Sequence, residues 1–305
     1  MKNRLTIAIQ KNGRLSEQSI DLLKKSGINF SYKGDKLLAK SNNLPIDILF
    51  VRSDDIPSLV SNGDADLAIV GENILIEKTL FKRTYIEKML NLGFSKCRLS
   101  FAVPQNSNIK NFKNKKIATS YPNTVKKYLK DNKINASVTN IHGSVELTPY
   151  IGMSDVICDL VSSGATLEAN NLKEIEIILQ SQAVLIKNKN ISAKKLSIAT
   201  KVINRMEGVI NAIESKYVML NSDASRVQEI CKLLPGSESP TIIPLENKNK
   251  VAIHALCQEP IFWETMEKLK LLKLTLQAYQ QEALIIEFIE LQQLVITLVV
   301  LQHYH

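Results

Sequence analysis

Hydrophobic and polar positions in the first part of the chain predict repeated strand–loop–helix units. The alternating segment Leu5–Gln10 predicts a strand, and apolar residues at helical spacing from Ile20 to Leu23 predict a helix that ends at Gly27. Ser16 is the expected N-cap of this helix, since serine is strongly preferred there. Strands that alternate with helices in this way indicate an α/β fold.

The same periodicities predict further elements along the chain. Strands are expected at residues 36–40, 46–51, 65–71, 98–103, 116–119, 136–141, 155–161, 175–179 and 183–187, and helices at 54–63, 125–129, 145–151 and 198–213. In the C-terminal part the expected order is strand 216–220, helix 224–234, strands 241–245 and 251–257, and helix 260–270. This β-α-β-β-α order is that of a ferredoxin-like domain that still needs one strand.

A faint internal repeat links two of these units. Gly63-x-x-Asp66-Leu67-Ala68 recurs 89 positions later as Gly152-x-x-Asp155-Val156-Ile157. In both copies a short helix should end at the glycine, and a strand and a glycine-bearing turn should follow. Two similar α/β lobes that face each other are the simplest explanation, and a chance similarity is the alternative. Ligands of such folds bind beyond the carboxyl ends of the strands.

The segment after the second copy is the main candidate for binding chemistry. Asp159 closes an apolar run, and Ser162, Ser163 and Gly164 form a turn before a helical segment that begins near Thr166. Glycine lets the backbone approach a ligand closely, and exposed N–H groups at a helix start favour a phosphate. Because a carboxylate before the turn could hold sugar hydroxyls, the segment predicts a site for a phosphorylated ribose. The alternative is an ordinary strand–turn–helix joint that Thr166 caps.

Composition narrows the class of protein. The formal net charge of +9 comes from scattered basic residues, with no basic run interleaved with aromatics, so nucleic acid is not the expected partner and small polyanions are. The four cysteines are widely spaced, which favours reduced core residues in the cytoplasm. The N-terminus shows no signal-peptide pattern, and no segment before residue 270 resembles a membrane span. We therefore expect a cytoplasmic protein without a membrane partner.

Six ordered motifs carry a resemblance to a known family. They are Gln10-Lys11-x-Gly13-Arg14-Leu15, Asp54-Asp55-Ile56-Pro57, Gly71-Glu72-Asn73, Ala118-Thr119-Ser120-Tyr121-Pro122, Asp159-Leu160-Val161-Ser162-x-Gly164-Ala165-Thr166-Leu167-Glu168-Ala169-Asn170, and the segment Phe262–Lys270. With these motifs the chain resembles the long form of the ATP phosphoribosyltransferase family from about residue 4 to residue 270.

The resemblance implies a fold and an activity. The fold is α/β, with two lobes like those of type II periplasmic binding proteins and a C-terminal ferredoxin-like α+β regulatory domain. Lobe I would comprise residues 1–103 and 181–214, lobe II residues 104–180, and the regulatory domain residues 215–270. The activity is magnesium-dependent condensation of ATP with phosphoribosyl pyrophosphate (PRPP), the first step of histidine biosynthesis. Feedback inhibition by histidine and a homo-oligomer in dimer–hexamer equilibrium are also implied.

The resemblance also implies roles for individual residues. PRPP binding falls to Asp155, Asp159, Ser162, Ser163, Gly164, Ala165 and Thr166, and ATP binding to Gln10, Lys11, Gly13, Arg14, Glu72 and Tyr121. Arg14, Glu72 and Asp159 would be catalytic, and Ala252 and His254 would contact the effector histidine. The open alternatives are a solvated loop for Lys11 and Arg14, a structural role for Asp155, a helix-start acid at Glu72 and a core position for Tyr121. Mg²⁺ should arrive with the phosphates, so no dedicated metal site is expected.

The end of the chain departs from the family. Residues 271–305 contain no Gly, Pro, Asn, Asp or Ser, and an out-of-frame tail is the preferred explanation, with genuine divergence as the alternative. The segment Leu294–Leu301 could supply the missing strand, or a helix could run on to about residue 290. Either outcome puts histidine inhibition and hexamer formation in doubt. The competing functions are a non-catalytic binding protein on the same scaffold and an enzyme without histidine regulation.

Overall fold

The computed structural model describes residues 4–32, 36–213, 215–234, 240–258, 275–279, 284–287 and 299–300. The chain divides into two compact units, Met1–Glu207 and Gly208–His305, and the boundary falls within helix α6 (Ala193–Ile213). Among the described residues, the first unit contains two sheets and the second unit one sheet. No helix in the described ranges has the length and apolar character needed to cross a membrane.

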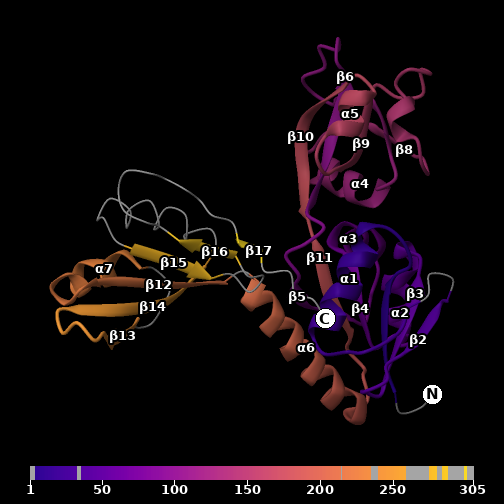
Figure 1. Ribbon diagram of the computed structural model, residues 1–305. Coiled ribbons are helices and arrows are strands. Elements are labelled where there is room, and N and C mark those ends of the chain that lie inside the picture. Colours follow the sequence, from indigo (N-terminus) through magenta and orange to yellow (C-terminus); the bar gives the residue numbers. More distant parts are fainter. Residues whose placement is uncertain are drawn as a thin grey trace. The chain divides into compact units, whose positions relative to one another are not determined.

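The first sheet of unit 1 has the strand order β2-β3-β1-β4-β11-β5 (Figure 1). Its strands are β1 (Leu5–Gln10), β2 (Leu38–Lys40), β3 (Ile46–Val51), β4 (Leu67–Gly71), β5 (Ile86–Asn91) and β11 (Ala183–Asn188). Its helical segments are α1 (Arg14–Lys25), η1 (Ser53–Asp55), α2 (Ile56–Asn62) and α3 (Glu72–Thr79). β1 is parallel to β3 and β4, whereas β11 returns from the other lobe and runs antiparallel to β4 and β5.

Glycine sets the start of α1, and the predicted N-cap is wrong. The helix begins at Arg14, and Gly13 holds the N-cap position with φ +88°, which an L side chain rarely adopts. Ser16 lies inside the first turn and is buried, and its hydroxyl donates to the carbonyl of Lys11 at 3.1 Å. The exit from β1 is therefore a tight glycine turn closed by a buried serine.

The second sheet of unit 1 has the order β10-β6-β9-β7-β8. Its strands are β6 (Cys97–Pro104), β7 (Lys116–Thr119), β8 (Ser137–Asn140), β9 (Val156–Val161) and β10 (Leu172–Ser181), and its helical segments are α4 (Pro122–Asp131), η2 (Val145–Leu147) and α5 (Ala165–Ala169). β9 is parallel to β7 and antiparallel to β6. The helix predicted at 145–151 is wrong beyond the short 3₁₀ turn η2.

The aspartate of the internal repeat makes the same contacts in both lobes. The backbone N–H of Asp66 donates to the carbonyl of Thr6, and the Asp66 carboxylate accepts the N–H of Thr6 at 2.8 Å. Asp155 makes the same two bonds with Lys116, again at 2.8 Å to the carboxylate. In each lobe an aspartate thus ties the start of a central strand to the start of its parallel neighbour, which explains why the acid recurs at this position.

The second unit has the sheet order β13-β14-β12-β15-β16-β17. Its elements are β12 (Ser215–Asp223), η3 (Ala224–Arg226), α7 (Val227–Leu233), β13 (Thr241–Pro244), β14 (Lys250–Gln258), β15 (Thr275–Tyr279), β16 (Leu284–Glu287) and β17 (Val299–Val300). Strands β12 to β15, the first four of this unit, form an antiparallel sheet in the ferredoxin-like order. The helix predicted at 260–270 lies outside the described residues.

The missing strand comes earlier than predicted. β15 pairs with β12 at the edge that the ferredoxin-like order requires, so the strand expected within Leu294–Leu301 does not take that place. A helix to about residue 290 is also wrong, because β15 and β16 occupy described parts of that range. β17 falls inside the expected segment but pairs with β16.

Candidate active site

The turn that follows β9 is open to solvent. Ser162, Ser163, Ala165 and Thr166 are exposed, and Gly164 has φ +92°, a conformation that favours glycine. Gly164 is also the N-cap of α5, and no side chain caps this helix, so the alternative in which Thr166 caps it is wrong. The Ser163 hydroxyl accepts the Ala165 N–H only at 3.4 Å. The turn therefore presents lightly bonded N–H and hydroxyl groups to a ligand.

Asp159 stands on β9 just before this turn and is costly to ionise. It is partly buried, and burial raises the pKa of its carboxyl, with a further contribution from the charge of Glu146. One oxygen accepts the backbone N–H of Leu160 at 2.8 Å, which offsets part of this effect on the pKa. A ligand that brings hydroxyl donors or a cation would stabilise the ionised carboxylate.

Asp155 lies at the opposite end of the same strand. The distance along β9 from Asp155 to Ser162 is about 23 Å at the usual rise per residue. The Asp155 carboxylate accepts the Lys116 N–H. The structure therefore places this predicted PRPP contact at the start of the strand, away from the turn, in a structural hydrogen bond.

The predicted ATP residues of lobe I gather where β1 ends. Gln10 is the last residue of β1 and its amide donates to the carbonyl of Asn12 at 2.6 Å, and Gly13 forms the tight turn. The exposed Arg14 guanidinium has no hydrogen-bond or ion-pair partner within the described residues. Lys11 is partly exposed, and its backbone N–H donates to the carbonyl of Val51 at 2.9 Å. The end of β1 therefore combines a narrow backbone turn with free positive charge.

Sequence reasoning missed Arg52 at this edge. Arg52 follows β3 directly, and the last residues of β1 and β3, Gln10 and Val51, are paired in parallel register. The side chain is exposed and has no partner in the described part of the chain. Its place after a strand parallel to β1 was the available signal, since the carboxyl ends of parallel strands meet at one edge.

Glu72 and Tyr121 have partners already. The Glu72 carboxylate accepts the ammonium of Lys88 at 2.7 Å. Tyr121 is only 7% exposed and belongs to the core of lobe II, where its hydroxyl accepts the Asn73 side-chain amide at 3.0 Å. Burial raises the pKa of the Tyr121 phenol, and the charges of Asp159 and Asp54 raise it further. Acids from the two lobes therefore lie near one buried tyrosine.

A buried carboxylate that sequence reasoning missed joins α3 to α4. Glu77 on α3 is 4% exposed and accepts the N–H of Asn123 at 2.9 Å, the N–H of Thr124 at 2.8 Å and the Thr124 hydroxyl at 2.7 Å. A negative charge at a helix N-terminus is favourable because the first N–H groups have no partner within the helix. No local pattern marks this residue, since its partners lie 46 and 47 positions away.

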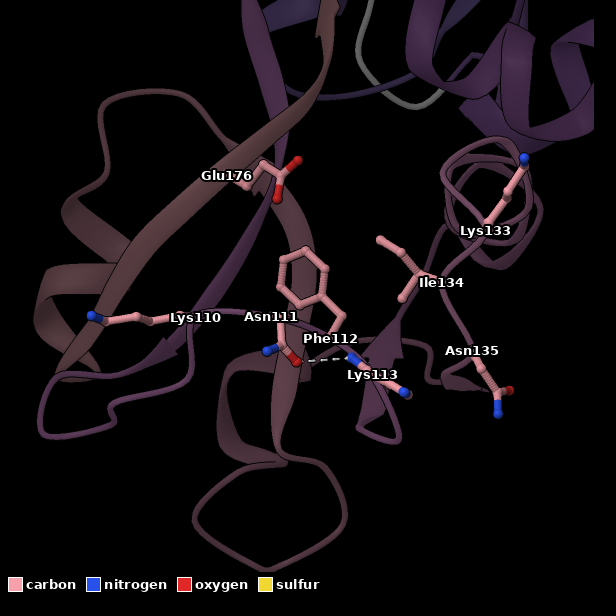
Figure 2. A pocket seen from close by; sticks show the side chains of 8 residues that line it. All are labelled: Lys110, Asn111, Phe112, Lys113, Lys133, Ile134, Asn135 and Glu176. Atoms are coloured by element: carbon pink, nitrogen blue, oxygen red, sulfur yellow. Dashed lines mark hydrogen bonds between the residues drawn. The ribbon is translucent and has the colours of Figure 1, made fainter.

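A cavity of about 500 Å³ lies elsewhere on lobe II (Figure 2). Its lining consists of Lys110, Asn111, Phe112, Lys113, Lys133, Ile134, Asn135 and Glu176. Lys113 and Asn135 precede β7 and β8, so the cavity lies near the amino ends of these strands and not at the turn after β9. Figure 2 shows the three lysine side chains pointing in different directions, which does not suit a single phosphate.

The predicted effector residues belong to β14 in the second unit. Ala252 is buried at 7% exposure. The His254 ring nitrogen Nδ1 lies 2.5 Å from the hydroxyl of Tyr217 on β12, with the rings edge to face. His254 thus already has a hydrogen-bond partner within its own sheet.

Comparison with known proteins identifies the family. The family model described as ATP phosphoribosyltransferase (HisG) matches residues 52–208, and that of the HisG C-terminal domain matches residues 212–273. The ATP phosphoribosyl transferase (HisG:HisZ) complex from Thermotoga maritima contains a chain that is 29% identical with a TM-score of 0.59, covering 68% of this chain and 98% of that chain. The Bordetella pertussis BvgS periplasmic VFT2 domain is 12% identical with a TM-score of 0.44, covering 68% of this chain and 92% of that chain.

The structure has the two α/β lobes and the ferredoxin-like C-terminal domain that the resemblance implied. The two family models together extend over most of the described residues. The chain therefore belongs to the ATP phosphoribosyltransferase family, the transferases of histidine biosynthesis, in its long form.

Proposed function

We propose that this chain transfers the phosphoribosyl group of PRPP to N1 of ATP in a magnesium-dependent reaction. Adenine N1 attacks the anomeric carbon and forms a C–N bond, while the C–O bond to pyrophosphate breaks and its electron pair leaves with pyrophosphate. The products are N1-(5-phosphoribosyl)-ATP and pyrophosphate. Positive charge develops on the ribose in the transition state, so the protein must align the two substrates and stabilise charge, without a covalent nucleophile.

The single observation that carries the proposal is the open turn after β9. Ser162 to Thr166 would bind the 5-phosphate through backbone N–H and hydroxyl groups, because Gly164 shapes the turn and its groups are exposed. Asp159 would accept hydrogen bonds from the ribose hydroxyls, which would replace the water that burial keeps from its carboxylate. The ionised Asp159 is then close to the developing positive charge, where it favours the transition state.

The ATP side of the site would lie at the end of β1. Arg14 and Lys11 would bind polyphosphate, since a guanidinium suits bidentate phosphate contacts and cannot be neutralised. Gln10 and Gly13 would shape the turn around the nucleotide. Glu72, the first residue of α3, would contact the substrates once its carboxylate has left Lys88. Tyr121 would contribute from the core by holding Asn73 and not by stacking on a substrate.

Magnesium, regulation and assembly belong to the same proposal. In the described part of the chain no three His, Cys, Asp or Glu side chains gather closely enough to hold a metal ion. Mg²⁺ would enter with the phosphates of PRPP and keep most of its waters. Histidine would inhibit the enzyme by binding at β14 near Ala252 and His254. Copies of the chain would assemble into dimers and hexamers. The protein would be located in the cytoplasm.

The proposed domains of the chain are those that the family resemblance implies. Residues 1–103 and 181–214 would form lobe I, residues 104–180 lobe II and residues 215–270 the regulatory domain. β15 adds residues 275–279 to the regulatory sheet. The atypical composition of residues 271–305 still favours an out-of-frame tail, which intact mass of the native protein would test.

A pyrophosphate-release assay with ATP and PRPP tests the activity. Release that needs both substrates and Mg²⁺ is the expected result, and binding of PRPP without release would point to a non-catalytic binding protein. Addition of histidine separates a regulated enzyme from an unregulated one.

Titration calorimetry with PRPP and Mg²⁺ tests the site. Asp159→Asn and Thr166→Ala should each weaken binding strongly, and wild-type affinity in both variants would remove the phosphoribose assignment.

A further inference from the structure

Arg98 on β6 joins the phosphate turn to the edge strand β10. Its Nε and Nη2 atoms each donate to one oxygen of Glu174 at 2.6 Å, and its Nη1 donates to the backbone carbonyl of Ser162 at 3.1 Å. The side chains of Arg98 and Glu174 are 27% and 25% exposed. Because a guanidinium bound to a carboxylate by two parallel bonds has a fixed orientation, Glu174 directs the third nitrogen toward Ser162.

This third bond fixes the peptide group between Ser162 and Ser163. In a trans peptide the carbonyl and the N–H point in opposite directions, and the described chain has no cis peptide bond. While Arg98 holds the Ser162 carbonyl, the Ser163 N–H must point away from the guanidinium. A rotation of this peptide would replace an N–H donor by a carbonyl oxygen, which repels an anion.

The Arg98–Glu174 pair also covers the sheet beside Asp159. Ser100 lies between Arg98 and Ala102 along one face of β6, and Glu174 is paired with Ala102 in the register, so the ion pair spans the position of Ser100. Ser100 is fully buried, stands opposite Asp159, and its hydroxyl has no hydrogen-bond partner of normal geometry among the described residues. It is nevertheless close enough to add to the lowering of the Glu174 pKa, which Arg98 dominates.

We propose that Arg98 is a positioning residue for the phosphoribosyl substrate, which holds the Ser162–Ser163 peptide so that the turn presents N–H groups to the 5-phosphate. Arg98 itself need not touch the substrate, because its donors to Glu174 and Ser162 are already used. The inference rests on the proposed function, and it adds the residue that sets the conformation of the turn.

Calorimetry on the full chain with ribose 5-phosphate and, separately, with ATP tests this role. Arg98→Lys keeps the charge but cannot bind Glu174 in a fork and reach Ser162 at once. We expect about tenfold weaker binding of ribose 5-phosphate, the loss of roughly one hydrogen bond, and unchanged binding of ATP. Glu174→Gln should act in the same direction, because it releases the guanidinium, and it replaces Arg98→Lys as the test if the latter does not fold.

Arg4→Lys is the matched control. Arg4 in lobe I likewise donates to a carboxylate, that of Asp47 at 2.7 Å, and to a backbone carbonyl, that of Ile46 at 2.7 Å. This variant should lose stability but keep both affinities. Unchanged affinity of Arg98→Lys for ribose 5-phosphate would overturn the inference, and so would an equal loss for ribose 5-phosphate and ATP. If the wild-type protein binds neither ribose 5-phosphate nor PRPP, the proposed function fails instead.

Discussion

The carboxylate of Glu77 should be one of the strongest single contributions to the stability of unit 1. It is 4% exposed and accepts three hydrogen bonds from Asn123 and Thr124 at the start of α4. Within the described residues it has no cationic partner, so the N-terminus of α4 is what stabilises its charge. The substitution Glu77→Gln keeps the size of the side chain and removes the charge.

The expected loss can be worked out from the three contacts. A glutamine can place its single oxygen at the two Thr124 donors, but its NH₂ group then faces the Asn123 N–H, which loses its acceptor. An unsatisfied buried donor costs about 1–3 kcal/mol, and the lost charge at the helix N-terminus adds about 0.3–2 kcal/mol. Relief of the buried charge offsets part of this sum. A net loss of about 2–3 kcal/mol corresponds to a melting temperature lower by about 4–12 °C for a unit of this size.

Thermal unfolding followed by circular dichroism measures the loss. Asp131→Asn is the matched control on the same helix, because it removes the exposed Lys127–Asp131 pair and should cost no more than about 0.5 kcal/mol. Amide hydrogen exchange at Asn123 and Thr124 should be faster in Glu77→Gln and unchanged in Asp131→Asn. Glu77→Gln melting within 1 °C or so of the control would refute the assignment of Glu77 as the cap of α4.

Three further predictions concern the turn and its surroundings. Burial raises the pKa of Asp159, so ionisation of its carboxyl destabilises the fold at neutral pH. Asp159→Asn should therefore melt higher than wild type at neutral pH, and the difference should shrink as the pH falls below the raised pKa and vanish below the unfolded pKa. A lower melting temperature of Asp159→Asn at neutral pH would contradict this. Gly164→Ala should lower the melting temperature and weaken ribose 5-phosphate binding, because the φ of +92° at this position costs an L residue about 1–2 kcal/mol. Gly208→Ala in α6 is the control: it has open space around it and should raise the melting temperature. Arg98 lowers the pKa of Glu174, so the ionised acid stabilises the fold above its unfolded pKa, and this stability is lost as the pH falls through the lower folded pKa. Glu174→Gln should therefore be less stable than wild type at neutral pH, and the two stabilities should converge in acid. Parallel curves of stability against pH would exclude the ion pair as the cause.

The backbone of the site was predictable because its signals are local. The apolar run before Asp159 and the glycine of the turn predicted a strand, a turn and a helix, and β9, Gly164 and α5 confirm them. Ser16 shows how a local rule fails, since serine is a favoured N-cap but the backbone required a positive φ at Gly13. β5 was missed because this edge strand carries mainly exposed or half-exposed residues and lacks a clean alternation.

The contacts that fix the site could not be read from the sequence. Arg98 reaches Ser162 and Glu174 across 64 and 76 positions, and only the strand order β10-β6-β9 brings them together. Glu77 likewise meets Thr124 only because α3 and α4 pack against each other. A charged residue on a predicted strand or helix usually faces solvent, so local patterns assign these residues to the surface.

The two lobes agree at the amino ends of their central strands and differ at the carboxyl ends. Asp66 and Asp155 make equivalent hydrogen bonds at the amino ends of β4 and β9, so the two lobes have the same structure at that end of the strands. The carboxyl ends differ. Gly71 leads into α3, whose Asn73 and Glu77 are hydrogen-bonded to residues of the second lobe. Gly164 instead closes an exposed turn before α5, and Arg98 binds the carbonyl of Ser162 in that turn. A duplicated scaffold of this kind can keep equivalent hydrogen bonds at one end of its strands while the other end diverges, in lobe I toward contact between the lobes and in lobe II toward the proposed phosphate site. The residues that distinguish this transferase from a simple binding protein are therefore to be sought at the carboxyl ends, where the two copies have diverged.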